Sequence, residues 1–469
     1  MNESSFAREL LIQFAYLISS ILFILGLSGL SDPKRARNGM RLAMLAMLFA
    51  VVGTLLHHDI VRFDWIIVGL VVGSFIGVVI GLPLGIDIPM TAMPQFVAIS
   101  HMFGAVAATL VGIDEYLALG TTPSAPIMGA LGAEVILGAL TVTGSFIAFA
   151  KLQELIGGRP ITFRGQNVFN ISLFVATIGL LVYQMIVPGQ PMVFFIMVGL
   201  ATMIGVLMVL PIGGADMPVV ISLLNAYAGL SASAMGFALN NNLLIVVGAL
   251  DGASGLLLSI LMCRAMNRSI MNVLFGAFGT VATNKSIKSA AGLTVKEVSV
   301  DDAAVSLAYA QNVIVVPGYG LAVARAQHLI REMADLIEKK GGEVRYAIHP
   351  VAGRMPGHMN VLLAEAEVPY DKLVDMEEIN DDFEKTDVAL VIGANDVVNP
   401  AARSDPSSPI YGMPILNVDK AKSVIVMKRG MGAGFAGIEN ELFFEPRTSM
   451  LFGDAKSSLG KLVTALKAL

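Results

Sequence analysis

Nine long apolar segments occupy the first 264 residues of this 469-residue chain. Each approaches the roughly 20 apolar residues that an α-helix needs to cross the core of a bilayer. The segments lie at residues 10–30, 40–57, 65–85, 94–112, 126–150, 168–187, 191–211, 218–238 and 242–262. They predict a polytopic all-α membrane bundle of about nine transmembrane helices, joined by mostly short connections.

The charge content changes along the chain. Residues 1–264 contain 10 Lys or Arg and 12 Asp or Glu, whereas residues 265–469 contain 21 and 24. The first composition is lipid-like and the second is that of an ordinary soluble protein. We therefore expect a transmembrane domain over residues 1–264, a polar linker over 265–300 and a soluble domain over 301–469. The net charge of −5 argues against nucleic acid as a partner, and the single Cys263 fits a reducing compartment.

The distribution of Lys and Arg predicts the orientation. Basic residues follow the first, fifth and ninth apolar segments, namely Lys34, Arg35 and Arg37, then Lys151, Arg159 and Arg164, then Arg264 and Arg268. The opposite side has only Arg8 and Arg62 near the segments. This asymmetry predicts an outside N-terminus and a cytoplasmic soluble domain. The first apolar run lacks a small-residue cleavage site, so we interpret it as a retained span.

The soluble half alternates strand-like and helix-like patterns. Apolar runs predict strands at Asn312–Pro317, Glu343–Ile348, 387–392 and 423–427. Residues 322–340 carry Leu329, Ile330, Met333, Leu336 and Ile337 on one face of a predicted helix. The alternation predicts an α/β Rossmann-like fold with a doubly wound parallel sheet.

A short glycine motif, Gly318-Tyr-Gly320-Leu-Ala-Val323, lies between the first strand and its helix, where a dinucleotide-binding turn belongs. Val323 occupies the third small-residue position, so a plain strand–helix turn is an equally good interpretation. The second strand is followed by residues 349–354, which hold no carboxylate for a ribose hydroxyl. Together with the cations Arg354, Lys428 and Arg429, this favours NADP over NAD.

Two further loops are candidate ligand sites. In Ile425-Val-Met-Lys-Arg-Gly-Met-Gly-Ala-Gly-Phe435, two cations leave a strand before a glycine-rich loop, whose N–H groups can bind phosphate. The alternative is a solvated strand end. Gly393-Ala-Asn-Asp396 follows the strand at 387–392, at the carboxyl edge, where Asn395 and Asp396 either bind a ligand or cap the next helix. We expect no metal site.

Polar residues inside apolar segments are costly and suggest function. His101 lies in the fourth segment, and an imidazole titrates near neutral pH, so it suits a proton relay; a structural histidine is the alternative. Other polar residues in or beside the segments are Glu134, Ser145, Asp216, Asn225 and Asp251. Glu134, Ser145 and Asn225 line the same path, or Ser145 and Asn225 serve as ordinary interhelical hydrogen-bonding residues. Asp216 lies at the predicted cytoplasmic mouth, and Asp251 is a buried acid that the pattern does not explain.

Long stretches in both halves give the chain a specific resemblance to the beta subunit of the proton-translocating NAD(P) transhydrogenase. They are Gly213-Gly-Ala-Asp-Met-Pro-Val-Val220, Met262-Cys-Arg-Ala-Met-Asn-Arg-Ser269, Pro317-Gly-Tyr-Gly320, His349-Pro-Val-Ala-Gly-Arg-Met-Pro-Gly-His-Met-Asn-Val-Leu-Leu-Ala-Glu365, Val391-Ile-Gly-Ala-Asn-Asp396 and Met450-Leu-Phe-Gly-Asp-Ala-Lys456. The resemblance implies hydride transfer between NAD(H) and NADP(H), of the Si–Re (B-specific) type, linked to proton movement.

The resemblance also implies partners and a location. An alpha subunit of one or two chains would bind NAD(H), and two alpha–beta units would form a dimer. The chain would lie in a bacterial inner membrane with its NADP(H) domain in the cytoplasm, and NADP(H) would bind in reverse relative to the usual Rossmann orientation. The competing hypothesis is an ion or solute transporter with an NADP-sensing domain, which would need a central solute site.

Residue by residue, the resemblance implies two sets of sites. The implied NADP(H) contacts are Gly318, Tyr319, Gly320, Val351, Ala352, Gly353, Arg354, Met355, Pro356, Gly393, Ala394, Asn395, Asp396, Val397, Gly412, Met413, Lys428, Arg429, Gly430, Met431, Gly432, Ala433, Gly434, Phe435, Asp454 and Ala455. The implied proton-path residues are His101, its channel partner Asn225, and Glu134, Ser145, Asp216 and Arg268.

The chain departs from the family pattern at three positions. Gly430 replaces a serine and Phe435 replaces a tyrosine, both in the 428–435 lid, and Asp251 stands where an aliphatic residue is expected. The first change removes a hydroxyl contact to the 2′-phosphate, and the second removes a phenol.

Overall fold

The computed structural model spans the whole chain. It describes residues 3–32, 35–57, 60, 63–81, 92–119, 124–153, 155–157, 161–213, 216–266, 269–270, 294–354, 357–405, 408, 410–434 and 436–469. They form two compact units. One, here the membrane unit, comprises Met1–Pro89, Gln95–Pro211 and Val220–Leu258; the other, here the sheet unit, comprises Met90–Pro94, Ile212–Val219 and Ser259–Leu469.

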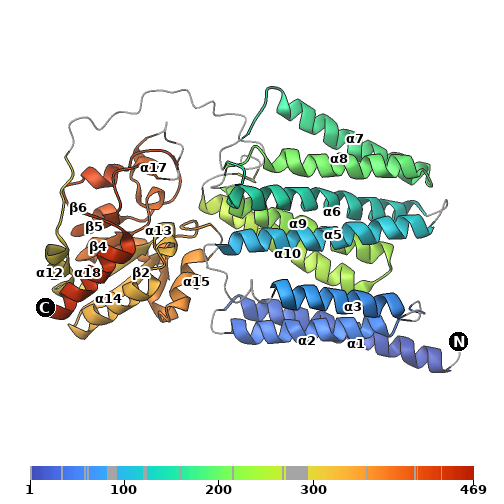
Figure 1. Cartoon of the computed structure of the whole chain (residues 1–469), viewed down its shortest axis with the longest axis horizontal. Helices are drawn as coiled ribbons and strands as arrows, with labels where there is room; N and C mark the ends of the chain where they lie inside the picture. Colours follow the sequence, from blue (N-terminus) through green and yellow to red (C-terminus); the bar gives the residue numbers. More distant parts are fainter. Residues whose placement is uncertain are drawn as a thin grey trace. The chain divides into compact units, whose positions relative to one another are not determined.

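Long apolar helices dominate the first half of the chain (Figure 1). They are α1 (Glu3–Leu30), α2 (Ala36–Leu55), α3 (Asp64–Ile76) with the π-helix η1 (Gly77–Gly81), α5 (Met93–Leu119), α6 (Ala125–Leu152), α7 (Gln166–Ile186), α8 (Pro191–Val209), α9 (Met217–Ala238) and α10 (Asn242–Ala265). Among the described residues, 8 helices are long and apolar enough to cross a membrane, which confirms the predicted bundle. The remaining prediction, residues 65–85, coincides with the shorter apolar helix Asp64–Val79; residues 82–85 lie outside the described chain.

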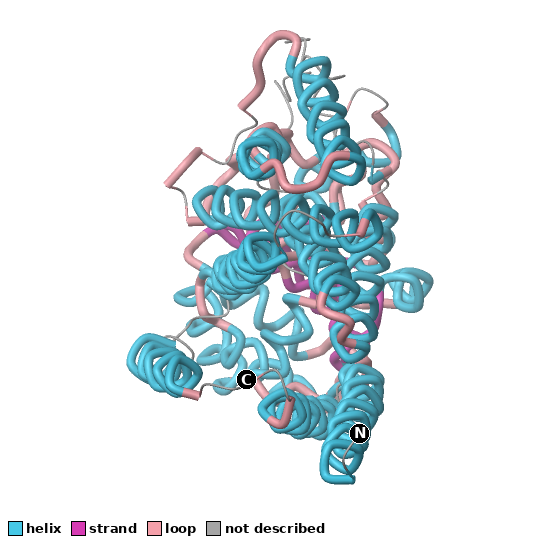
Figure 2. The backbone as a smooth tube through the Cα atoms, turned by 90° about the vertical axis from the view of Figure 1, so that its right-hand side faces the viewer, coloured by secondary structure: helices cyan, strands magenta, loops and turns pink. Residues whose placement is uncertain are grey.

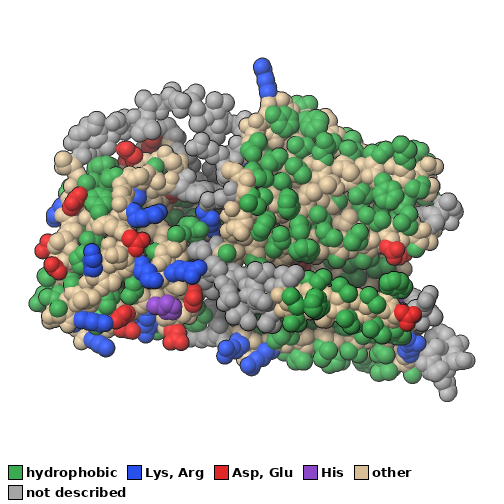
Figure 3. All heavy atoms as spheres, in the orientation of Figure 1, with side chains coloured by type: hydrophobic (Ala, Val, Ile, Leu, Met, Phe, Trp, Pro, Cys, Tyr) green, Lys and Arg blue, Asp and Glu red, His purple; other side chains and the backbone are tan. Residues whose placement is uncertain are grey.

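Glycines let these helices approach one another closely. A Cβ on Gly39 of α2 would lie 2.7 Å from the Gly26 carbonyl oxygen of α1, so only glycine fits there. In the same way, a Cβ on Gly205 of α8 would lie 2.1 Å from the Leu140 carbonyl oxygen of α6. Small residues at helix contacts are typical of packing in lipid, where no hydrophobic force drives helices together. The outer faces stay apolar, as the space-filling view shows for one side (Figure 3).

Polar side chains satisfy the carbonyl groups at several helix ends. The ammonium group of Lys151, in the last turn of α6, is buried and donates to the carbonyl oxygens of Val209 (3.4 Å) and Leu210 at the end of α8. A cation at a helix C-terminus also interacts favourably with the helix dipole. Lys151, counted above as a loop cation, is therefore part of the packed bundle.

The second half of the chain folds as an α/β unit. Its strands are β1 (Asn312–Pro317), β2 (Glu343–Ile348), β3 (Leu373–Asp375), β4 (Val388–Ile392), β5 (Ser423–Lys428) and β6 (Thr448–Phe452). Its helices are α12 (Val300–Ala308), α13 (Tyr319–Val323), α14 (Gln327–Lys339), α15 (His358–Glu365), α16 (Met376–Ile379), α17 (Ala401–Ser404) and α18 (Ala455–Ala468). All the described strands belong to this sheet unit (Figure 2).

The six strands form one sheet in the order β3-β2-β1-β4-β5-β6, and every pairing is parallel. This order confirms the predicted doubly wound fold. The four predicted strands are β1, β2, β4 and β5. The sequence analysis missed β3, which has only 3 residues, and β6, whose sequence Thr-Ser-Met-Leu-Phe is too short and mixed to stand out.

The helix predicted at residues 322–340 is divided in two. Arg325 has a positive φ of 48°, which ends α13 and lets α14 begin at Gln327. The predicted apolar face of α14 is correct, since Ile330, Met333 and Ile337 are fully buried in the core of the sheet unit. The break follows from tertiary packing, because no glycine or proline marks it in the sequence.

Candidate functional site

Two loops meet at the carboxyl edge of the sheet, between β1 and β4, where the strand order reverses. The Gly318 N–H donates to the Ile392 carbonyl (2.9 Å), and the Gly320 N–H donates to the Gly393 carbonyl (3.0 Å). A Cβ on Gly320 would lie 2.6 Å from the Gly393 Cα, and Gly393 itself has a φ of +70°. Ligands of doubly wound sheets bind at this reversal point. Here the Gly318 and Gly320 N–H groups are already engaged within the protein.

The loop after β2 is linked to α13 through Tyr319. The guanidinium carbon of Arg354 lies 4.5 Å from the Tyr319 ring centroid, and the ring of His358 packs edge-on against Tyr319 at 5.8 Å. The Arg354 N–H donates to Nδ1 of His358 (3.0 Å). Burial and the charge of Arg354 lower the pKa of His358, so its ring is neutral. These contacts hold the cation Arg354 beside the β1–β4 loops.

His349, the first residue after β2, connects this loop to the segment that follows α17. The Val351 N–H donates to Nδ1 of His349 (3.2 Å), so Nε2 carries the proton and donates to the Pro414 carbonyl (2.8 Å). His349 is 2% exposed. Burial lowers its pKa to about 4. The neutral ring therefore joins residues 351–354 to the neighbourhood of Met413.

The lid, residues 428–435, packs on the loop after β4. The carboxylate of Asp396 accepts a hydrogen bond from the N–H of Ala436, the residue after the lid (2.9 Å). A Cβ on Gly434 would lie 2.3 Å from side-chain atoms of both Asn395 and Asp396. Buried Asn440 donates to the carbonyl and side-chain oxygens of Asn395, each at 3.0 Å. The C-terminal end of the lid is thus docked on the side chains of Asn395 and Asp396.

The two cations of the lid differ in environment. Lys428, at the end of β5, is half-buried; its ammonium group lies 4.6 Å from the Phe443 ring centroid and donates to the Gly432 carbonyl. Burial lowers the pKa of Lys428, and the charge of Asp396 opposes that effect. Arg429 is exposed. Lys428 therefore shapes the lid, whereas Arg429 is available to solutes.

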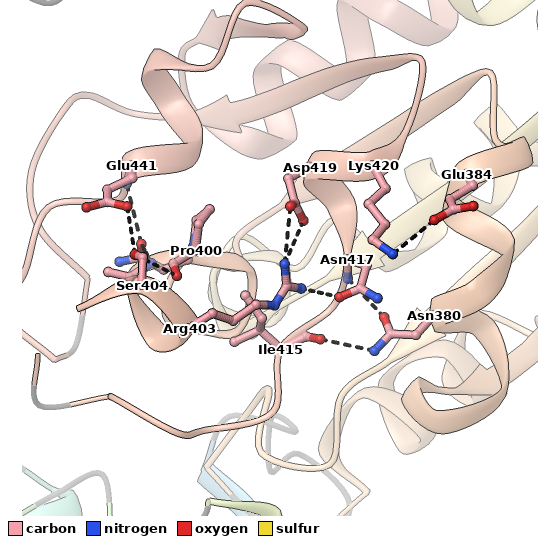
Figure 4. Close-up of polar contacts among 12 residues, drawn as sticks. Asn380, Glu384, Pro400, Arg403, Ser404, Ile415, Asn417, Asp419, Lys420 and Glu441 are labelled. Carbon is pink, nitrogen blue, oxygen red and sulfur yellow. Dashed lines mark hydrogen bonds and ion pairs between the residues drawn. The ribbon is translucent and has the colours of Figure 1, made fainter. Parts of the chain in front are cut away.

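A polar network joins Arg403, Asn417 and Asp419 to Asn380 (Figure 4). The guanidinium group of Arg403 donates to the Asp419 carboxylate (3.2 Å) and to the side-chain oxygen of Asn417. The Asn417 N–H in turn donates to the side-chain oxygen of Asn380 (2.9 Å). The network lies at the base of the segment that carries the predicted contacts Gly412 and Met413. Sequence patterns do not predict this network, because single polar residues carry no periodic signal.

The predicted cofactor segments are therefore connected to one another. The last of them begins at Asp454, whose side chain caps α18 by accepting from the Ser457 N–H (3.0 Å), while the preceding Gly453 N–H donates to the Lys428 carbonyl (3.0 Å). Met355, Pro356 and Phe435 lie outside the described residues. Residues that sequence reasoning missed here are His349, His358, Asn380, Arg403, Asn417 and Asn440. Two of them, His349 and His358, belong to the stretch His349–Glu365 that carries the resemblance. Their closeness to Arg354 in the sequence was the signal that could have identified them.

The polar residues of the membrane unit fall into separate groups. Asn225 on α9 donates to the Asp251 carboxylate on α10 (3.1 Å), and the Nδ1 atom of His101 on α5 is buried and has no hydrogen-bond partner among the described residues. Glu134 on α6 is 1% exposed, and its backbone carbonyl accepts from Ser231 on α9 (2.8 Å). Within the described residues, the Glu134 Oε1 atom has no hydrogen-bond partner.

The other three predicted proton-path residues are Ser145, Asp216 and Arg268. Ser145, on α6, is fully buried, and its hydroxyl has no hydrogen-bond partner among the described residues. Asp216 directly precedes α9. Arg268 lies outside the described chain. Of the predicted proton-path residues that the structure describes, Asn225 is joined to Asp251 by a side-chain hydrogen bond.

Comparison with known proteins identifies the family. A family model described as NAD(P) transhydrogenase beta subunit matches residues 12–465. A relative from Rhodospirillum rubrum, named NAD(P) transhydrogenase subunit beta, is 50% identical over 464 residues, which cover 96% of this chain and 98% of the relative. The protein of that name from a defined strain of the same species matches at the same 50% identity. With its apolar helices and its parallel sheet, the chain is thus a multi-pass membrane protein that belongs to the NAD(P) transhydrogenase beta subunit family.

Proposed function

We propose that the chain binds NADP(H) at the carboxyl edge of its sheet and couples hydride transfer between NAD(H) and NADP(H) to proton translocation. The observation that carries the proposal is the convergence of five segments at that edge, each held by a specific contact: the loops after β1, β2 and β4, the lid, and the N-terminus of α18. Family membership supplies the reaction class, a nicotinamide nucleotide transhydrogenation.

The residues present fit a phosphorylated dinucleotide. Arg354, Lys428 and Arg429 supply positive charge on two sides of the edge, and no carboxylate occupies the stretch 349–354 after β2. Arginine binds phosphate oxygens through charge-assisted hydrogen bonds. A Cβ at Gly430 would meet nothing within 4 Å, so the lid backbone is accessible there. Bound NADP(H) would supply the hydride donor or acceptor.

The engaged amides of Gly318 and Gly320 support a reversed cofactor. In the usual Rossmann arrangement this turn and the helix behind it bind the pyrophosphate. Here both N–H groups already donate within the protein, to the carbonyl oxygens of Ile392 and Gly393, and α13 is only 5 residues long. The lid, with its exposed Arg429 and its glycines, then offers the better phosphate site. We assign the 2′-phosphate to Lys428 and Arg429, and the remaining contacts to Tyr319, Arg354, Asp396 and the other implied positions.

The membrane unit is proposed to conduct protons past His101 and Asn225. A family of beta subunits implies an alpha subunit, and we assign NAD(H) binding to it. The proposed assembly is a dimer of alpha–beta units in a bacterial inner membrane, with residues 301–469 in the cytoplasm and Si–Re stereochemistry. Glu134, Ser145, Asp216 and Arg268 are the further proposed members of the proton path.

The test is reconstitution of the purified chain with and without its alpha subunit. NADPH oxidation against an NAD analogue is followed in both samples, together with acidification of the vesicle lumen. Activity and pumping are expected only with the partner, because one nicotinamide site cannot support transfer between two nucleotides. Turnover by the chain alone, or an NADPH-dependent solute flux without hydride transfer, would contradict the proposal.

A further inference from the structure

A cluster of basic residues lies where the chain enters α2. Four cations occur within eight positions of the sequence, namely Lys34, Arg35, Arg37 and Arg41, and one carboxylate, Asp32, precedes them. The Arg35 guanidinium lies 3.7 Å from the Asp32 carboxylate in an exposed ion pair. Four positive charges and one negative charge leave this stretch with a net charge of +3.

Arg37 and Arg41 lie on the face of α2 that is turned away from α1. The face that contacts α1 is marked by Gly39, Ala46 and Gly53, which are buried at intervals of seven residues. Arg37 and Arg41 are each two positions from Gly39, about 200° around an α-helix, so both belong to the opposite face. Both are exposed, and neither has a hydrogen-bond or ion-pair partner in the part of the chain that the structure describes. Their Cα atoms are about 6 Å apart along the axis, so one phosphate group is within reach of both side chains.

The same face of α2 continues as an apolar surface. Met44, Leu45 and Leu48 follow Arg41 at the i+3, i+4 and i+7 positions, and they are 59%, 47% and 58% exposed. Basic side chains gather at this end of the α1–α2 hairpin, and apolar side chains cover its length (Figure 3). Exposed apolar side chains on a membrane helix contact acyl chains. The face therefore presents cations and then apolar groups, the order in which a phospholipid presents its phosphate and its acyl chains.

We propose that Arg37 and Arg41 bind the phosphate of an anionic phospholipid whose acyl chains lie along Met44, Leu45 and Leu48. With 20 residues, α2 has about the length of the hydrocarbon core, which places its first turns at the level of the lipid phosphates. Guanidinium groups bind phosphate through charge-assisted, often bidentate hydrogen bonds. Each basic residue at an anionic membrane surface strengthens binding about fivefold. The alternative is that the cations only direct insertion of the hairpin, which requires no particular lipid in the folded protein.

The experiment places a fluorescent reporter beside the cluster. In the full chain, Trp65→Phe removes the single tryptophan, and Met44→Trp introduces one next to Arg41. This reporter chain is reconstituted in phosphatidylcholine vesicles that contain brominated phosphatidylglycerol or brominated phosphatidylcholine, and bromine quenching measures which lipid lies at the site. Phosphatidylglycerol is expected to bind about tenfold more strongly than phosphatidylcholine, and Arg37→Gln/Arg41→Gln should reduce that preference to about twofold or less.

Arg164→Gln/Arg264→Gln in the reporter chain is the matched control, since it removes two exposed cations that lie outside the cluster. Its preference should stay at the level of the reporter chain, and soluble glycerol phosphate should not lower it, because the acyl chains contribute to binding. Circular dichroism verifies the fold of each variant. Arg41→Gln alone, with an expected reduction of about fivefold, replaces the double variant if the latter does not reconstitute.

Four results would overturn the inference. The first is equal quenching by the two brominated lipids in the reporter chain, and the second is an undiminished preference in the uncharged variant. The third is a lack of quenching by either lipid, which would show that protein covers this face of α2. The fourth is loss of the preference on adding glycerol phosphate, which would make the cluster a site for free phosphate groups. The proposed function is unaffected by each of these results, because the lipid site does not depend on the reaction.

Discussion

At the scale of single residues, Arg429 is the cation most directly available to a ligand. It is exposed at the end of β5, whereas its neighbour Lys428 is held by the Phe443 ring and the Gly432 carbonyl. Gly430, in place of a serine, removes one hydroxyl from the same loop. Recognition of the 2′-phosphate should therefore depend on Arg429 more heavily than on any neighbour.

Arg429→Ala is expected to weaken NADPH binding by an order of magnitude or more and to leave NADH binding nearly unchanged. The reason is the loss of charge-assisted hydrogen bonds to the 2′-phosphate, worth about 1.5–3 kcal/mol. Isothermal titration calorimetry with both nucleotides measures this. Lys461→Ala, which removes an exposed cation from α18, is the control. Equal losses for NADPH and NADH would show that Arg429 does not read the phosphate.

His349 makes the sheet unit sensitive to acid. Its pKa is about 4 in the folded protein and near 6.5 when unfolded, so the unfolded chain binds more protons between these values. Stability is therefore fully present above pH 6.5 and falls as the pH drops toward 4. We expect a loss of about 2 kcal/mol between pH 7 and pH 5 from this residue.

Urea unfolding of residues 294–469 at pH 7 and pH 5 measures that loss. His349→Asn removes the titrating ring, so the variant should be less stable at pH 7 but should lose about 2 kcal/mol less on acidification. Identical pH dependence in the two proteins would assign the acid sensitivity to other groups.

At the scale of elements, the lid is held by one glycine in particular. A Cβ on Gly434 would lie 2.3 Å from side-chain atoms of Asn395 and Asp396, but a Cβ on Gly432 would meet nothing within 4 Å. The two positions therefore form a matched pair within one loop. One contacts the loop after β4 and the other faces open space.

Gly434→Ala is expected to displace the lid, break the hydrogen bond from Ala436 to Asp396, and weaken NADPH binding about tenfold or more, which is the loss of one hydrogen bond to a charged group. Gly432→Ala should bind NADPH as the wild type does. Fluorescence titration measures affinity, and hydrogen exchange at the Ala436 amide reports lid docking. If both variants bind NADPH equally well, the docked lid does not contribute to the site.

At the scale of the whole molecule, coupling requires that the state of the membrane unit bias the sheet unit. In the proposed function, a proton on His101 favours one arrangement of the helices, and by linkage that arrangement changes NADP(H) affinity. Most of the predicted linker, residues 271–293, lies outside the described chain.

His101→Ala is expected to abolish proton pumping by the reconstituted complex and to slow NADPH release, because the switching group is gone. The isolated segment 301–469, which lacks His101, should still bind NADPH normally. Lumen acidification and stopped-flow release of NADPH are the measurements. Pumping at the wild-type rate would make His101 a packing residue and move the proton path elsewhere.

Much of this protein follows from the sequence alone. Apolar segments of fixed length predict membrane helices, because lipid imposes one length on every span. Four strands of the sheet, and hence its doubly wound class, follow from buried apolar runs such as Asn312–Pro317 and Glu343–Ile348. The motifs that resemble the transhydrogenase beta subunit are local stretches of sequence, so the family could be predicted without knowledge of the fold.

Tertiary structure decided what depends on residues distant in the chain. The edge strands β3 and β6 form because β2 and β5 offer them hydrogen bonds, not because of their own pattern. Three sets of hydrogen bonds join segments that are separate in the sequence. They are those of the Gly318 and Gly320 N–H groups, those of the neutral His349 and His358 rings, and those of the Arg403 network. Asp251 looked like an isolated buried acid. Only the backbone contact of α9 with α10 brings it to Asn225, because a hydrogen bond requires proximity in space and local sequence carries no record of it.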